Sequence, residues 1–499
     1  MRKTVSIILI ITTALSIITA CAKEAEGTEN KNITNETTSA KVDETTTSEY
    51  VSPEVNYNGT EITVGAIDYM AYGSVLFIEM IKYCDAYSPE MNGDPIHDAL
   101  YIRNQKIEEE LGVKIKPYSF VDFISGGPEI RKLVLANEDV IDIAFINGNN
   151  LTALLGTDMI IDLYGIPNVD FKHSWWDQNS VNEFELFGKL KTVTGSASTY
   201  RIFSPMILFF NKKVAEEYIP ENIYDLVRNG EWTLSKRIEM CRIVAHDLNG
   251  DGVMDIEDFW GTTTGSADCA NHIIAGGVRF TVKDAGGVPQ IAVNTQRTAD
   301  IIEISVPFLN DTSMTFSPEL FASKFTSVNL YSDIMLPIFA DNRALFCSNN
   351  MYTTMDLRNM EADFGILPHA KFDAEQENYY CPLTPAWCTF VVVPSTNSKL
   401  EITGHVLDAL GYYSQQEVTP AYIDTTVMNK VLRDDDSAEM LQLVFANRYY
   451  DLGMIYDWGT IYTMFAAMAG NKNTNFASEY AKIESKILAG IEKTIEELR

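Results

Sequence analysis

Oxygen-bearing side chains recur at set offsets in the stretch 247–258. Its members, with their positions in the stretch, are Asp247 (1), Asn249 (3), Asp251 (5), Asp255 (9) and Asp258 (12), and the carbonyl of Val253 is available at position 7. A calcium-binding loop places its ligands at these offsets and carries glycine, here Gly252, at position 6. The spacing therefore predicts a structural Ca²⁺ site. Aspartate at position 12, where such loops usually carry glutamate, favours modest affinity. The alternative is a polar surface turn that binds no ion.

Catalytic motifs are poorly represented. The 6 histidines are scattered and form no His-Glu-x-x-His pair. The chain has no Gly-x-Ser-x-Gly elbow and no glycine-rich phosphate loop. Because 69 acidic residues are present, a carboxylate pair suited to glycoside hydrolysis is compatible with the sequence, but no spacing marks one out. The sequence therefore favours a protein that is not an enzyme.

Aromatic residues stand beside amides and carboxylates at several places. The clusters are Trp175-Trp176-Asp177-Gln178, Asn349-Asn350-Met351-Tyr352, Tyr379-Tyr380 and Trp387. Sugar rings stack their apolar faces on aromatic rings, while amides and carboxylates bond the hydroxyl groups. The clusters are therefore compatible with a saccharide site. For each single aromatic residue, packing in the core is the alternative.

Composition limits the class of protein. The chain has 499 residues, with 38 Lys and Arg against 69 Asp and Glu, so its formal net charge is −31. This acidic balance argues against nucleic acid as a partner, because neutralising phosphates requires clustered basic residues. Hydrophobic residues make up 46% and charged residues 21%, which is typical of globular proteins. The length suits about two or three domains.

The N-terminus indicates export. Arg2 and Lys3 precede an apolar and hydroxyl-bearing run over 4–20, which is typical of a secretion signal. The ending Ile18-Thr19-Ala20-Cys21 resembles the lipobox of bacterial lipoproteins, in which the cysteine becomes the lipidated first residue. We therefore expect a signal peptide over 1–20 and a lipid on Cys21, which is the only membrane attachment. The alternative is an uncleaved anchor helix.

The segment after Cys21 has little to bury. Residues 21–53 combine acids with serine and threonine runs, so we expect a disordered tether that holds the folded part of the protein at the extracellular face of the membrane.

Six further cysteines follow the tether, and no two of them form a Cys-x-x-Cys pair. Buried free thiols are at least as compatible with this pattern as disulfides, and their pairing is left open.

From residue 59 onward, short apolar strands alternate with amphipathic helices. We expect strands over 61–65, 113–115 and 140–146, and helices that end near Leu111 or span 129–137. The C-terminal stretch 477–499 has the pattern of a charged amphipathic helix. Strand, helix and strand in succession predict an α/β fold with a parallel sheet.

The order of these pieces resembles the extracellular solute-binding proteins of bacterial ABC importers, the group that includes carbohydrate binders. The resemblance covers roughly residues 62–499. It rests on the lipobox, Ile62–Gly65, Asp142-Ile143-Ala144-Phe145, Trp175-Trp176, Leu208-Phe209-Phe210-Asn211-Lys212, Gly230-Glu231-Trp232-Thr233, the acidic loop 247–258, Phe364-Gly365-Ile366-Leu367-Pro368 and the acidic helix entry at Asp434-Asp435-Asp436. Each motif is weak alone, and their order and spacing carry the resemblance.

This resemblance implies a two-lobed periplasmic-binding-protein-like α/β fold of type II. The expected first lobe comprises 54–193 and 335–389, and the second comprises 194–334 and 390–499 with the cation loop. Crossing segments are expected near 191–194, 341–342 and 389–391, and closure would be a hinge motion.

The resemblance also implies a ligand site between the lobes. The residues carried over to it are Asn147, Trp176, Tyr200, Asn350, Tyr352 and Trp387. Trp176 and Trp387 would be stacking platforms, while Asn147 and Asn350 would bond ligand hydroxyl groups.

The expected function is capture of an extracellular solute, an oligosaccharide above all, by a monomeric protein that delivers it to an ABC transporter permease. A surface polysaccharide-degrading enzyme and a calcium-stiffened adhesin are the alternatives. A peptide or metal binder of the same shape would differ only in the cleft.

Overall fold

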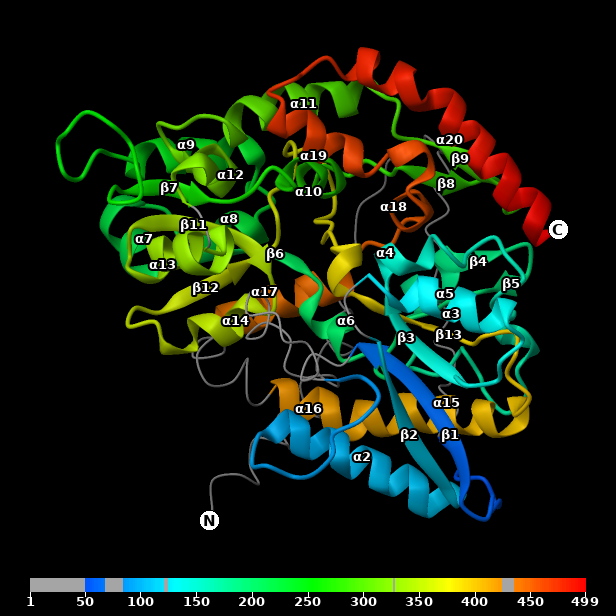
Figure 1. Ribbon diagram of the computed structural model, residues 1–499. Coiled ribbons are helices and arrows are strands. Elements are labelled where there is room, and N and C mark those ends of the chain that lie inside the picture. The colour runs from blue at the N-terminus through cyan, green and yellow to red at the C-terminus, as the bar shows by residue number, and fades with distance from the viewer. Residues whose placement is uncertain (1–49, 68–83, 121–123, 326–327, 424–434) are drawn as a thin grey trace, which may run out of the picture. The chain divides into compact units, whose positions relative to one another are not determined.

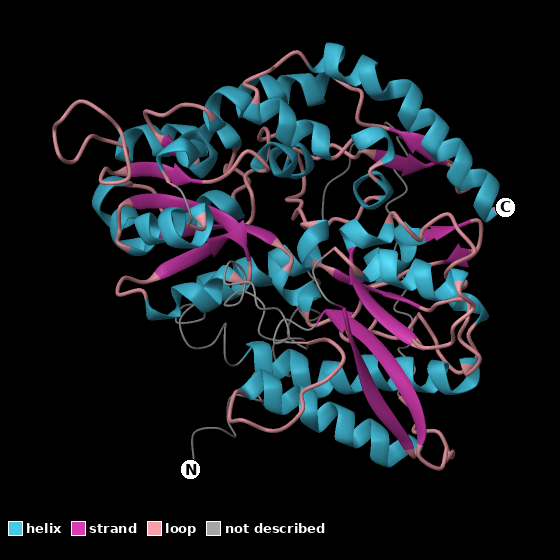
Figure 2. Cartoon of the chain, in the orientation of Figure 1, coloured by secondary structure: helices cyan, strands magenta, loops and turns pink. Residues whose placement is uncertain are grey.

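The computed structural model describes residues 50–67, 84–120, 124–325, 328–423 and 435–499. By its internal contacts the chain divides into Met1–Thr46 and Thr47–Arg499. The first unit, which holds the predicted signal peptide, Cys21 and most of the predicted tether, lies outside the described residues. In the second unit, helices surround two separate sheets (Figures 1 and 2). No helix in the described part of the chain has both the length and the apolarity that a membrane span requires.

The first lobe is built on a four-stranded sheet in the order β13-β3-β1-β2. Its strands are β1 (Thr60–Ile67), β2 (Val113–Phe120), β3 (Ile143–Asn147) and β13 (Thr389–Val392). β2 and β3 run parallel to β1, and β13 runs antiparallel to β3. Every residue of β3 is buried, as expected for a strand that is covered on both faces.

Helices α2 (Pro95–Leu111) and α15 (Leu400–Tyr413) pack together on this sheet (Figure 1). Asp94 caps α2 by accepting hydrogen bonds from the N–H groups of Ile96 and His97, and Pro95 supplies a φ suited to the first turn. Gly112 ends the helix at φ +63°, where glycine is favoured. The other helices of this lobe are α3 (Gly126–Leu135), α4 (Gly148–Leu151), α5 (Gln178–Phe184) and α16 (Thr419–Tyr422).

The second lobe is built on a five-stranded sheet in the order β10-β7-β11-β6-β12. Its strands are β6 (Met206–Asn211), β7 (Trp260–Thr263), β10 (Thr315–Phe316), β11 (Ala344–Asn350) and β12 (Phe364–Leu367). β6 is antiparallel to both of its neighbours. Its helices are α7 (Lys212–Tyr218), α8 (Ile223–Arg228), α9 (Leu234–Val244), α10 (Asp268–Ala275), α11 (Gln296–Leu309), α12 (Pro318–Phe321), α13 (Leu336–Ala340), α14 (Thr353–Asp356) and α17 (Asp435–Ala446).

The two-lobed α/β architecture agrees with the prediction, but the late segments were assigned to the wrong lobes. β11 and β12 pair with β6, so most of the range 335–389 belongs to the second lobe, not to the first. β13 pairs with β3, so the range after 389 starts in the first lobe, not in the second. Residues 341–342 join α13 to β11 inside the second lobe, so the predicted crossing there is wrong.

Three segments that run between the lobes lie side by side. The N–H of Met206 donates to the carbonyl of Pro382 at 2.8 Å, and the N–H of Cys381 donates to the carbonyl of Asn447 at 2.9 Å. The Thr194 hydroxyl donates to the carbonyl of Thr389 at 2.9 Å. The crossing segments therefore span about 191–205, 368–388 and 447–451, and they support one another through backbone hydrogen bonds.

The C-terminal region contacts both lobes. Its helices are α18 (Leu452–Tyr456), α19 (Thr463–Gly470) and α20 (Phe476–Leu498), beside the hairpins β4–β5 (Glu185–Leu186, Lys189–Leu190) and β8–β9 (Thr281–Lys283, Pro289–Ile291). α20 packs against α11 of the second lobe. At its far end the Arg499 guanidinium lies 4.9 Å from the ring centroid of Phe187, which turns the first-lobe hairpin (Figure 1).

A close contact between α15 and the backbone of Pro167, which follows the 3₁₀ turn Leu163–Gly165, generates a stability prediction. A Cβ atom on Gly404 would lie 1.7 Å from the carbonyl oxygen of Pro167, which is backbone and cannot rotate away. We expect Gly404→Ala to lower the free energy of unfolding by about 2 kcal/mol, since forced overpacking of a core usually costs about 1–3 kcal/mol. Thermal and urea unfolding measure the change.

The matched control is Gly470→Ala in α19, where an added Cβ meets nothing within 4 Å. Alanine is the better helix former there, so this variant is expected to be neutral or more stable by up to about 1 kcal/mol. Equal stability of the two variants would contradict the packing argument.

Candidate functional site

Asn147 and Trp387 lie close together where β3 and β13 pair. Asn147 ends β3 opposite Thr389 in the register. Its side chain accepts a hydrogen bond from the N–H of Asn150 at 3.1 Å and thereby caps α4. Trp387 ends a short 3₁₀ turn that packs against α4, and it is only partly buried. A Cβ on Gly148 would lie 2.7 Å from Pro385, so glycine permits this close approach.

Tyr200, Asn350 and Tyr352 gather around α6 (Tyr200–Phe203), on the first crossing segment. The ring centroid of Phe203 lies 5.8 Å from that of Tyr200 and 5.2 Å from that of Tyr352. Asn350 is the last residue of β11, opposite Met206. A crossing segment, which carries Tyr200, and the second lobe, which carries Asn350 and Tyr352, are therefore brought together here.

Asn350 has an unsatisfied polar atom. Its side chain is buried, and its Oδ1 accepts no hydrogen bond from any residue that the structure describes. A buried acceptor without a donor costs about 1–3 kcal/mol, which a ligand hydroxyl could recover.

Trp176 does not offer a ring face. It is 1% exposed, and its ring centroid lies 5.0 Å from that of Phe171 inside the first lobe. The burial and the packing are those of a core residue, so the structure does not support its predicted role as a stacking platform. Asn147, Tyr200, Asn350 and Tyr352 are buried as well, and of the six predicted ligand residues only Trp387 keeps part of its surface exposed. The indole N–H of Trp176 has no acceptor.

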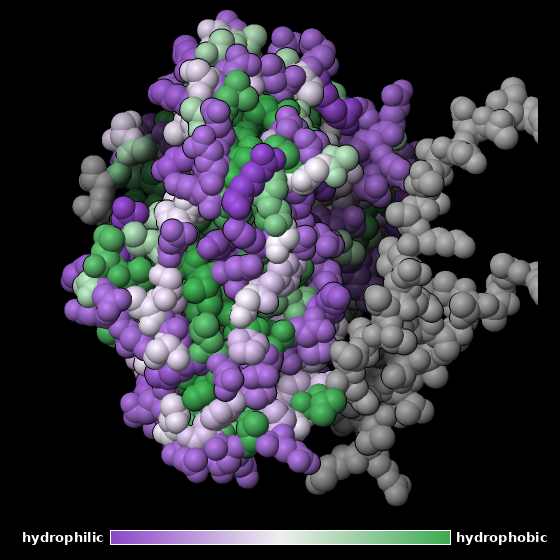
Figure 3. Space-filling model, turned by 90° about the vertical axis from the view of Figure 1, so that its right-hand side faces the viewer, coloured by the Kyte–Doolittle hydropathy of each residue, from purple (hydrophilic) through white to green (hydrophobic). Residues whose placement is uncertain are grey.

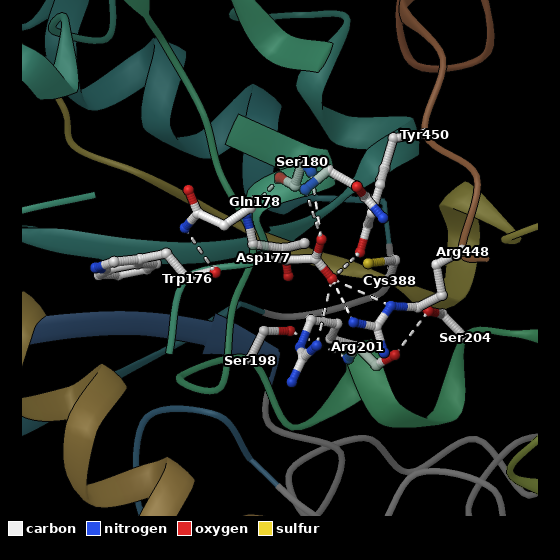
Figure 4. A network of polar contacts seen from close by, with 12 residues as sticks. Trp176, Asp177, Gln178, Ser180, Ser198, Arg201, Ser204, Cys388, Arg448 and Tyr450 are labelled. Atoms are coloured by element: carbon white, nitrogen blue, oxygen red, sulfur yellow. Dashed lines mark hydrogen bonds and ion pairs between the residues drawn. The ribbon is translucent and has the colours of Figure 1, made fainter. Parts of the chain in front are cut away.

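The Asp177 carboxylate is the centre of a buried polar network that sequence reasoning missed (Figure 4). Its Oδ2 accepts from Arg448 Nη2 at 2.6 Å, from the Tyr450 hydroxyl at 3.1 Å and from Arg201 Nη1 at 3.3 Å. Its Oδ1 accepts from the N–H of Ser180 at 3.3 Å and caps α5. Only the cap is visible in the sequence, since both arginines are distant along the chain.

The electrostatics of this network favour the ionised carboxylate. Burial raises the pKa of Asp177, but the guanidinium groups of Arg448 and Arg201 outweigh burial, so the pKa lies below its ordinary value. Asp177 therefore stays charged near neutral pH and joins α5 to two crossing segments.

A second buried cluster lies inside the second lobe. The ligand atoms of Asp268, His272 and His369 lie within 4.8 Å of one another, and among the described residues this is the one group that could hold a metal by that measure. Arg237 Nη1 already lies 3.1 Å from His272 Nε2, and its guanidinium is 3.9 Å from Asp268. Burial lowers the pKa of His369 to about 4, so that ring is neutral. The arginine supplies the positive charge that a metal would bring, so the cluster does not favour one.

The predicted cation loop connects α9 to β7 and projects from the second lobe (Figure 1). The Asp247 carboxylate accepts from the N–H groups of Gly250 and Gly252, at 2.6 and 2.7 Å. Gly252 has φ +82°, as the sharp turn requires. Asp258 is buried, and its two oxygens accept from the N–H groups of Leu248 and Asp255. The turn fits a cation loop, but in the described residues the carboxylates do not converge on one point.

None of the six cysteines after Cys21 forms a disulfide in the described part of the chain, whereas the sequence left their pairing open. They are Cys84, Cys241, Cys269, Cys347, Cys381 and Cys388. Five of them are buried, which is typical of cysteine used as a small apolar residue.

The surface around α20 is mainly hydrophilic with smaller apolar patches (Figure 3). Leu488 of this helix is 54% exposed.

Known protein families and curated sequences give no match to this chain. Solved structures do. A cyclo/maltodextrin-binding protein complexed with maltotetraose matches with a TM-score of 0.56 and 8% identity, over 88% of this chain and 97% of its own. An ABC substrate-binding protein from Listeria monocytogenes in complex with cycloalternan matches with a TM-score of 0.53 and 10% identity, over 88% and 99%.

The chain has the two-lobed solute-binding fold. The GacH receptor of Streptomyces glaucescens, solved unliganded and in complex with acarbose, has it too, with a TM-score of 0.51, 10% identity and coverage of 88% and 98%. At these identities the likeness is one of fold, and these neighbours are binding proteins. The fold confirms the α/β class and the two lobes that the sequence predicted.

The Asp177 network generates the second stability prediction. Asp177→Asn would leave two buried guanidinium groups without a counter-charge, and breaking a buried pair in this way usually costs about 3–5 kcal/mol. We expect a correspondingly lower thermal midpoint at pH 7. Because the folded pKa is depressed, the stabilisation is present above the ordinary value of 3.8 and is lost as the pH falls further. The difference in thermal midpoint between wild type and Asp177→Asn should therefore become smaller below about pH 4.

The control is Asp225→Asn, which removes a half-exposed carboxylate that pairs with Arg228 on the surface. A surface pair contributes about 0–1 kcal/mol, so little change is expected. A variant at Asp177 that melts like this control would show that the network does not stabilise the fold.

Proposed function

We propose that this protein captures an oligosaccharide outside the cell by closing its two lobes and delivers it unaltered to an ABC transporter permease. The observation that carries the proposal is that the 3₁₀ turn ending at Trp387 packs against α6, while Phe203 of α6 packs against Tyr352 of the second lobe. Asn147 comes from the first lobe, Trp387 lies at the end of a crossing segment, and Asn350 and Tyr352 come from the second lobe. The solute-binding fold supports the same conclusion, since its solved examples bear maltotetraose, cycloalternan and acarbose.

The chemistry of these residues suits a sugar. Trp387 keeps part of its surface exposed, and a sugar ring can stack on it. The unpartnered Oδ1 of Asn350 can accept a hydrogen bond from a hydroxyl group. Closure is favoured only if the ligand makes better contacts in the closed state than in the open state, and a ligand that touches both lobes meets this condition.

Two further features of the proposal concern location. We propose that Cys21 carries the lipid that holds the protein at the extracellular face of the membrane, and that residues 21–53 act as a spacer. The motif Ile18-Thr19-Ala20-Cys21 supports this proposal. Mass spectrometry of the N-terminal peptide from membrane fractions tests it, because an unmodified Cys21 or an intact 1–20 segment would contradict it.

We also propose that the loop 247–258 binds one Ca²⁺ as a structural clip. Asp247, Asn249, Asp251, Asp255 and Asp258 would supply side-chain oxygens, and Val253 would supply its carbonyl. The ordered turn at Gly252 supports the proposal, while the engaged oxygens of Asp258 argue for weak binding.

Ligand binding is the central test. We expect the thermal midpoint of the purified protein to rise with a bound oligosaccharide, in proportion to RT ln(1 + [L]/Kd). In a screen that starts with maltotetraose, Trp387→Ala should weaken the binding of the sugar that stabilises wild type by about tenfold or more, since a stacked ring contributes about 1–3 kcal/mol.

The control is Tyr164→Ala, which removes a 43% exposed aromatic side chain of the first lobe. It should bind the same sugar as tightly as wild type. Release of reducing ends would favour the enzyme alternative, and an absence of any shift across neutral and acidic sugars would contradict capture.

Calcium is tested separately. We expect Ca²⁺ at millimolar concentration to raise the thermal midpoint and a chelator to reverse the rise, since an ion that binds only the folded state stabilises it. Asp247→Asn should abolish the effect. Asp284→Asn is the control, because Asp284 also accepts backbone N–H bonds in an exposed turn but lies outside the loop. An equal shift in both variants would contradict a site in 247–258.

A further inference from the structure

Two guanidinium groups share one carboxylate at the crossing segments. Arg448 contacts Asp177 Oδ2 through Nη2 at 2.6 Å and Nε at 3.1 Å, and Arg201 contacts it through Nη1 at 3.3 Å. Within the described part of the chain, Asp177 is the one carboxylate that forms an ion pair with either arginine. The three groups therefore carry one excess positive charge.

This excess charge is poorly solvated. The side chains of Asp177, Arg201 and Arg448 are 3%, 12% and 13% exposed. A buried charge without a counter-charge is unfavourable, and the usual remedies are a partner ion or direct hydrogen bonds. In a chain whose formal net charge is −31, a local surplus of positive charge is also unusual.

The surplus belongs to Arg201 rather than to Arg448. Burial opposes the charge of both, but the proximity of Asp177 outweighs burial at Arg448 and raises its pKa. The pKa of Arg201 is lowered, by burial first and by the neighbouring Arg448 second. Arg201 Nε is buried and donates to no acceptor among the described residues. In Figure 4 one nitrogen of the Arg201 guanidinium faces Asp177 and another points away from the carboxylate.

Arg201 also lies where the ligand is expected. It follows Tyr200 on α6, and Phe203 of the same turn packs against Tyr352 of the second lobe. Its side chain is 12% exposed, and because Nε is buried, a bound molecule could touch only the other part of the side chain. A guanidinium presents two parallel donors that match a carboxylate or a sulfate.

We propose that Arg201 binds an oxyanion group, a carboxylate or sulfate, carried by an acidic saccharide. This inference rests on the proposed function, because it names the class of oligosaccharide that the site takes. The bound oxyanion supplies the missing counter-charge at the crossing segments. The charge of the ligand would thereby stabilise the segments that join the two lobes.

Isothermal titration calorimetry with two probes of equal length tests the proposal: neutral maltotetraose and tetragalacturonate. We expect wild type to bind tetragalacturonate more tightly, and we expect its affinity for this probe to fall as NaCl is raised. Arg201→Gln should weaken tetragalacturonate binding by about tenfold or more and weaken maltotetraose binding by a smaller factor. Arg201→Lys should lie between, since lysine keeps the charge without the paired donors.

The matched control is Arg297→Gln, which removes an arginine that pairs with Asp373 on the second lobe. It should bind both probes as wild type does. The salt dependence of wild type and the Arg201→Lys variant keep the test valid if Arg201→Gln fails to fold.

Four outcomes would overturn the inference. Tetragalacturonate binding that is unaffected by Arg201→Gln excludes Arg201. If maltotetraose binds and tetragalacturonate does not, the proposed capture function is retained, but the proposal of an acidic ligand is wrong. Sodium sulfate that stabilises wild type as strongly as tetragalacturonate at the same concentration would show a site for free anions. If neither sugar binds, the proposed function fails together with this inference.

Discussion

The carboxylate of Asp177 joins parts of the chain that folding must bring together from far apart. It caps α5 in the first lobe through its Oδ1, and it holds Arg201 and Arg448 from two crossing segments through its Oδ2. Backbone hydrogen bonds between these segments then fix the third one, since Cys381 pairs with Asn447 and Pro382 pairs with Met206. A buried charge of this kind specifies one arrangement, because any other would leave ions unpaired.

The candidate ligand site depends on this arrangement. Tyr200 precedes Arg201 on α6, and the N–H of Met351 donates to the carbonyl of Pro205 at 2.9 Å, so the end of β11 is held against the same segment. Asn350 and Tyr352 flank that contact. The side chains that would touch a ligand are thus placed by the same contacts that join the lobes, and binding and closure are expected to be coupled.

The sequence predicted what local patterns determine. The strands expected over 61–65, 113–115 and 140–146 overlap β1, β2 and β3, and the helices expected over 129–137 and 477–499 overlap α3 and α20. Hydrophobic periodicity reports burial, and caps report helix ends. Neither reports which strand pairs with which, and for this reason β11, β12 and β13 were assigned to the wrong lobes.

The site was predictable only in part, for the same reason. The family resemblance named Asn350 and Trp387 as ligand residues, and both lie near the crossing segments. It also named Trp176, but the sequence around Trp176 does not tell whether its ring faces a ligand or packs on Phe171, as it does in the structure. The three members of the Asp177 network stand at 177, 201 and 448, and nothing in their local sequence links them. Long-range pairing of charges is decided by topology, which a single sequence does not display.

The C-terminal helix α20 constrains how the lobes can swing. It packs against α11 of the second lobe, and Arg499 at its end packs on Phe187 of the first lobe. The helix therefore connects the two lobes at a place other than the crossing segments. Separation of the lobes must therefore move or break one of these two contacts, so α20 limits how far the lobes can open.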